Sequence, residues 1–94
     1  MQKICEFQDI QMAIDFNEKA FPQVRAIYRD VMGIFSIESG KLIDVLNGEI
    51  DDFPVREERL VNAWIQIHKS ELIRCWQELV KDKNVSLNAI APLQ

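Results

Sequence analysis

The residue best suited to chemistry in this sequence is a histidine, and its surroundings are apolar. His68 is the single histidine of the chain, and Glu71 follows it three residues later. On a helix these two positions are neighbours, so the pair has the composition of a general acid–base unit. The histidine also shares an apolar face with Trp64 and Trp76, where a core imidazole with both nitrogens satisfied is the commoner arrangement. We expect His68 to be the polar centre of a packed core, and the alternative is a small enzyme or nucleic-acid-acting domain centred on His68 and Glu71.

No other pattern in the sequence supplies a chemical site. One histidine with two distant cysteines, Cys5 and Cys75, does not provide the three or four ligands that a metal needs. The acidic stretch 49–52 lacks the spacing of a calcium loop, and the chain has no P-loop, dinucleotide fingerprint or serine elbow. We therefore assign no catalytic residue and expect neither a metal nor a cofactor.

Size and charge narrow the class of protein. A chain of 94 residues predicts a single domain, residues 1–94, and 48% hydrophobic residues are enough for a core. The formal net charge of −4, with no basic run, disfavours nucleic acid as a partner. No apolar run is long enough for a signal peptide or a membrane span, and the two cysteines do not form a disulfide framework. We expect a cytoplasmic protein that does not enter a membrane.

Residues 1–50 have the alternating pattern of strands. Met12, Ile14 and Phe16 alternate with more polar or smaller neighbours, which is typical of a half-buried strand. Gln8-Asp9 and Ser39-Gly40 supply turn chemistry, and similar turn residues separate the other apolar runs. The pattern predicts an antiparallel β-meander of four to five strands.

The second half of the chain changes to helical spacing. No glycine or proline occurs from residue 55 to residue 83, and the pattern predicts one long helix over 54–83, with a bend near Lys69-Ser70 left open, followed by an extended tail over 85–93. The fold class is therefore α+β, with the meander packed on the helix. The apolar positions of that helix span roughly two-thirds of its circumference, well beyond the roughly 100° of an ordinary surface helix. Either the tail or a second chain must cover the surplus.

Three helix residues are candidates for that contact. Trp64, Trp76 and Ile73 lie on the apolar arc, where they pack either in the core or against a partner. The surplus of apolar surface and the lack of a chemical constellation favour a non-enzymatic protein-interaction module, which acts through its sheet edge or the apolar helix face. Its partner is another protein or a second copy in a homodimer.

The helix also resembles a known family of small bacterial proteins, domain-of-unknown-function family 4160. The resemblance rests on the pattern P-x4-R-L-V-x2-W-x3-H-x2-E-L-x3-W, which is formed here by Pro54, Arg59, Leu60, Val61, Trp64, His68, Glu71, Leu72 and Trp76. The hairpin over 37–48 and the ending Ile90-Ala91-Pro92-Leu93 are similar to that family as well. The resemblance implies an uncharacterised protein whose genes often neighbour small partner genes, in arrangements suggestive of toxin–antitoxin or regulatory modules.

One departure from the family pattern limits what can be carried over. Where members typically have the histidine–proline cluster H-x-P-P-H-x-H, this chain has Lys19-Ala20-Phe21-Pro22-Gln23-Val24-Arg25. Only Pro22 matches, so the groups for metal binding or proton transfer at that cluster are missing. No site residue is transferred from it.

Overall fold

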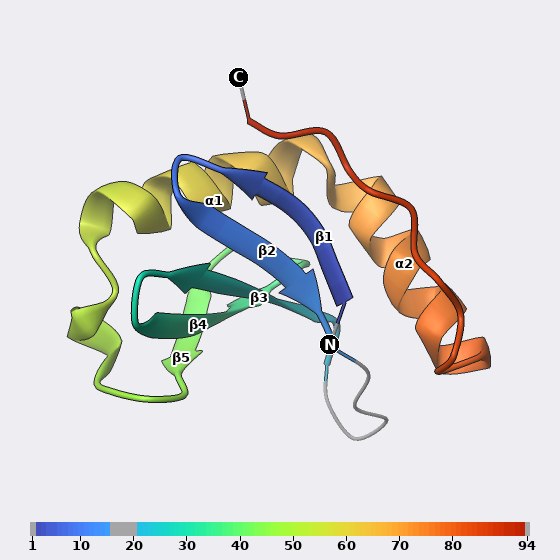
Figure 1. Cartoon of the computed structure of the whole chain (residues 1–94), viewed down its shortest axis with the longest axis horizontal. Helices are drawn as coiled ribbons and strands as arrows, with labels where there is room; N and C mark the ends of the chain where they lie inside the picture. The colour runs from blue at the N-terminus through green and yellow to red at the C-terminus, as the bar shows by residue number, and fades with distance from the viewer. Residues whose placement is uncertain (1, 16–20, 94) are drawn as a thin grey trace.

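A five-stranded antiparallel sheet forms one layer of the protein, as the computed structural model shows for residues 2–15 and 21–93 (Figure 1). The strands follow one another in the order of the chain, and each pairs antiparallel with the next. They are β1 (Gln2–Phe7), β2 (Ile10–Ile14), β3 (Gln23–Tyr28), β4 (Val31–Ser36) and β5 (Leu42–Val45). Phe16, expected in the second strand, lies outside the described residues.

Tight turns join β1 to β2 and β3 to β4, and residues of both turns adopt left-handed backbone angles. Gln8 and Asp9 have φ values of 51° and 64°, and Arg29 has a φ of 54°. Such turns match the right-handed twist of the strands that they connect. The turn expected at Gln8-Asp9 is therefore present between β1 and β2.

The helical half of the chain departs from the expectation of one long helix. A short 3-10 helix, η1 (Ile50–Asp52), precedes α1 (Val55–Ile67) and α2 (Lys69–Lys81). The prediction of a single helix over 54–83 was wrong, because His68 leaves the helical region with φ −106° and ψ 21°. The chain changes direction there, close to the bend left open at Lys69-Ser70 (Figure 1).

The break explains the wide apolar arc read from the sequence. Each short helix buries an apolar stripe of its own, and the two helices run in different directions over the same core (Figure 1). The apolar stripes consist of Val61, Trp64 and Ile65 in α1 and of Leu72, Trp76 and Leu79 in α2. At the margins of the arc, Ile67 and Val80 remain 65% and 56% exposed. The excess apolar surface expected on a single long helix is therefore mostly divided between α1 and α2.

The tail returns along α2 to the first strand of the sheet (Figure 1). The Ile90 N–H donates to the Ile4 carbonyl at 2.8 Å. The Gln2 amide donates to the Val85 carbonyl at 2.7 Å and accepts from the Leu87 N–H at 3.0 Å. Because Ile90 is also buried in the core, the tail covers the β1 edge and part of the helical layer.

None of the helices in the described part of the chain is both long and apolar enough to cross a membrane.

Candidate functional site

His68 stands at the corner between α1 and α2, and the backbone hydrogen bonds hold it there. Its N–H donates to the Trp64 carbonyl at 3.0 Å, and its own carbonyl accepts from the Leu72 N–H at 2.9 Å. Helix-type bonds therefore flank the corner on both sides although the His68 backbone is not helical. A corner fixed in this way holds the imidazole in one place.

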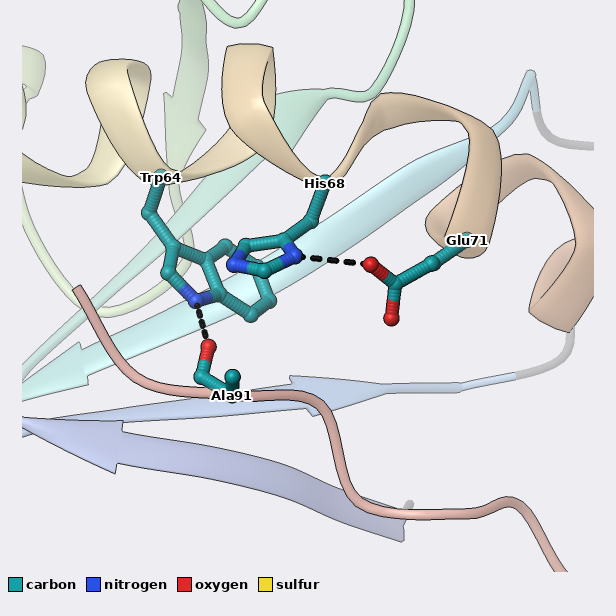
Figure 2. Close-up of polar contacts among 4 residues, drawn as sticks. All are labelled: Trp64, His68, Glu71 and Ala91. Atoms are coloured by element: carbon teal, nitrogen blue, oxygen red, sulfur yellow. Dashed lines mark hydrogen bonds and ion pairs between the residues drawn. The ribbon is translucent and has the colours of Figure 1, made fainter.

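The imidazole contacts Glu71 on one side and Trp64 on the other (Figure 2). The His68 Nδ1 atom lies 2.9 Å from Glu71 Oε1, and the imidazole and indole centroids are 5.4 Å apart with an interplanar angle of 50°. The expected neighbourhood of His68, Glu71 and Trp64 is thus formed. The His68 side chain is 12% exposed and that of Glu71 is 43% exposed. The imidazole is therefore mostly buried, whereas the carboxylate that contacts it is partly open to solvent.

The contact with Glu71 determines what the other ring nitrogen can do. An ionised carboxylate only accepts hydrogen bonds, so we assign the donor proton to Nδ1. In the neutral ring this leaves Nε2 as an acceptor. No described residue donates a hydrogen bond to Nε2. The expected partner is present at Nδ1, where Glu71 accepts, and Nε2 is not a buried atom because the corner places the ring at the edge of the core.

The two tryptophans belong to the core of this chain. Trp64 is fully buried, and its Nε1–H donates to the Ala91 carbonyl at 2.8 Å, which ties the tail to α1 (Figure 2). Trp76 is 6% exposed, and Ile73 is half-buried at the margin of the core. Coverage by the tail therefore accounts for much of the apolar surface for which a partner was an alternative.

A cavity of about 300 Å³ lies next to His68, between α1 and the tail. Besides His68, it is lined by Ile67, Ala91, Pro92 and Leu93. The cavity was not predictable from local sequence pattern, because three of its five lining residues lie more than 20 positions away in a tail without regular structure. The similarity of Ile90–Leu93 to a family ending was the one signal that this segment had a defined place.

The second notable region is the opposite edge of the sheet, which we call the acidic edge and define as residues 42–58. Of the seven large hydrophobic side chains that the described residues expose, Ile43, Leu46, Ile50 and Val55 belong to it. The same segment holds six acidic residues and one arginine. From the sequence, the acidic stretch 49–52 was recognised only as lacking calcium-loop spacing, and its link with the exposed apolar side chains was not predicted.

A second cavity adjoins this edge, between the β4–β5 turn, η1 and α1. It has a volume of about 580 Å³ and is lined by Gly40, Lys41, Leu42, Ile50, Asp51, Glu58, Arg59 and Asn62. Its wall is fixed, since the Asn62 side-chain amide donates to the Gly40 carbonyl at 2.8 Å. Gly40 has a φ of +74°, and a Cβ there would meet the Asn62 side chain at 2.8 Å, so a glycine is required where the turn packs on α1.

The two cysteines lie near the tail. Burial raises the pKa of the thiols of both Cys5 and Cys75, which keeps them protonated at neutral pH. Within the described ranges, no three histidine, cysteine, aspartate or glutamate side chains are grouped so as to hold a metal ion.

Comparison with known proteins gives one match. The model of the family described as Domain of unknown function (DUF4160) matches residues 10–77, a stretch that runs from β2 into α2 and includes both the acidic edge and the His68–Glu71 pair. Neither a curated protein nor a solved structure matches the chain significantly. Because the family model covers well over half of the 94 residues, this chain belongs to the DUF4160 family.

Proposed function

We propose that the protein is a non-enzymatic interaction module and that a protein partner binds the acidic edge, residues 42–58. The observation that carries this proposal is the concentration of exposed apolar side chains there. Four of the seven large ones occur within residues 43–55, although this stretch is a small part of the chain. Exposed apolar side chains scattered singly need no explanation, whereas four within 13 consecutive residues support an interaction surface.

The backbone of the β5 edge argues for docking through side chains. Ile43 is an extra residue in the pairing of β4 with β5, because Ile34 pairs with Asp44 and Phe35 with Leu42. The next free N–H, that of Val45, donates to Asp44 Oδ1 at 2.8 Å. A bulge and an edge carboxylate both discourage the addition of another strand. The partner accordingly contacts the apolar and acidic side chains rather than extending the sheet.

The charge of the acidic edge specifies the chemistry of the partner. Glu57 is buried and pairs with Arg56 at 2.8 Å, and the other five carboxylates of the edge make no ion pair with a described residue. Asp51 and Glu58 line the cavity of about 580 Å³, which offers a place for an inserted side chain. A protein segment with apolar residues and a lysine or arginine complements this surface. The family resemblance makes the product of a neighbouring small gene the first partner to test.

Site-specific cross-linking in the cell of origin tests the proposal. A photo-reactive amino acid at position 46 probes the acidic edge, and the same amino acid at Val80, which is equally apolar and exposed on α2, is the matched control. We expect a cross-linked protein from position 46 that is lost when Ile43→Ser and Ile50→Ser are introduced. The isolated complex should weaken as salt rises, because charge pairs at an exposed surface are screened. Equal cross-linking from both positions, or none from position 46, would contradict the proposal.

A second candidate function is a small enzyme centred on His68 and Glu71, and the observation in its favour is the 2.9 Å contact that orients the imidazole. Catalysis by such a pair also needs a nucleophile or a group that stabilises developing charge. The described residues that line the adjoining cavity are Ile67, Ala91, Pro92 and Leu93, which supply no such side chain. The arrangement therefore supports binding better than bond formation.

A further inference from the structure

The cavity beside His68 combines apolar walls with one polar side chain. Ile67, Ala91, Pro92 and Leu93 provide the apolar lining, and His68 provides a ring nitrogen. The Ala91 carbonyl is already engaged by the Trp64 indole N–H at 2.8 Å. The volume of about 300 Å³ lies at the lower end of the range for small-molecule sites.

In the neutral tautomer assigned above, the available ring nitrogen is an acceptor of fixed direction. Glu71 accepts from Nδ1 and so leaves the Nε2 lone pair as the hydrogen-bonding group that the ring can offer to a ligand. The ring is held by the helix corner and by its contact with the Trp64 indole, so little order is lost when a donor binds. Nε2 is not a buried atom, so it can be reached from the cavity, and a ligand hydroxyl can donate to it there.

The lining also specifies the charge of the ligand. Among the described residues, no charged side chain lines this cavity, and Glu71, which contacts His68, lies outside the lining residues. An ionised ligand would lose hydration there without gaining a counter-charge. A neutral molecule with an apolar body keeps the benefit of leaving water.

We propose that this cavity binds a small, neutral, apolar molecule that carries one hydroxyl group, with the hydroxyl donating to His68 Nε2. Phenol is the simplest rigid member of this class. The site is separate from the acidic edge and shares no residue with it. The inference is therefore independent of the proposed protein partner, and either one stands if the other fails.

Titration of the full chain with phenol, followed by amide NMR, tests the inference. Toluene is the matched probe, because it has the same shape without a donor and is more hydrophobic. We expect phenol to shift the signals of Ile67, His68 and Leu93 and to bind at least about tenfold more tightly than toluene, as a site built for a hydroxyl group does. No saturable shift up to about 10 mM phenol, which corresponds to binding weaker than about 3 kcal/mol, or toluene binding as tightly as phenol, would overturn the inference.

Two variants locate the binding. His68→Phe keeps an aromatic ring and removes the acceptor, so the preference for phenol over toluene should disappear. Ile67→Trp fills the cavity from an exposed position and should abolish the shifts, whereas Val80→Trp places the same ring on α2 at a comparable exposure and should leave them unchanged. Binding that survives Ile67→Trp, or a preference for phenol that survives His68→Phe, would show that the ligand does not occupy this cavity.

Discussion

The two edge strands of the sheet, β1 and β5, differ in whether another segment of the chain covers them. The β1 edge is covered by the tail, which bonds to Ile4 and Gln2 and packs into the core. The β5 edge has no such cover among the described residues and is protected instead by an extra residue at Ile43 and the carboxylate of Asp44. One edge thus contributes stability, whereas the other remains available at the surface. This difference is consistent with the proposal that a partner binds at the β5 edge and with a stabilising role for the β1 edge.

The largest expected effect is on the covered side. Trp64→Ala removes a fully buried indole and its bond to the Ala91 carbonyl. We expect a loss of about 3–5 kcal/mol in the free energy of unfolding, measured by urea denaturation. Trp64→Phe, which keeps a ring but not the donor, should cost less. A change below about 1 kcal/mol in the alanine variant would mean that the tail and α1 are not coupled as described.

A smaller loss is expected at the hydrogen bonds between the chain ends. Gln2→Ala removes the side chain that bonds both Val85 and Leu87, at 2.7 and 3.0 Å. We expect a loss of about 1–2 kcal/mol in the free energy of unfolding and faster hydrogen exchange at Leu87. Gln11→Ala, at an exposed glutamine on β2, is the control and should change neither quantity. Equal effects at both positions would remove the distinction between the covered edge and the rest of the sheet surface.

The smallest effect on stability is expected at the open edge. Leu46 is 51% exposed and contributes little buried area. We expect Leu46→Ser to change the free energy of unfolding by no more than about 0.5 kcal/mol while it weakens partner binding. Thermal unfolding and cross-linking from position 43 measure the two consequences separately. A large loss of stability would show that this edge is structural, and the contrast between the edges would then fail.

The sheet and its turns were largely predictable because their signals are local. Alternating apolar residues and turn residues such as Gln8-Asp9 predicted antiparallel strands close to the observed ones. The short helix η1 was missed, because Asp51-Asp52 is also a normal beginning for a longer helix. The local sequence pattern therefore predicted whether a segment is a strand or a helix better than it predicted the residue at which the element begins.

The helix corner and the His68 cavity were not predictable from local pattern. The helical spacing of apolar residues continues through His68, and no glycine or proline marks the change of direction. The cavity beside His68 is formed where the tail passes α1, and this contact joins residues that are distant in sequence. The composition of the site, His68 beside Glu71 and Trp64, was predictable because all three lie within two helical turns of one another.

The bonds between the two ends of the chain also govern the order of events during synthesis. The Ile4 carbonyl cannot meet the Ile90 N–H until 86 further residues have been joined. At about 5–20 residues per second, the β1 edge is without its cover for about 4–17 s on the ribosome. Once β5 (Leu42–Val45) has also been made, the nascent chain presents two open sheet edges instead of one until the tail arrives, and it is then most exposed to mispairing and to capture by chaperones.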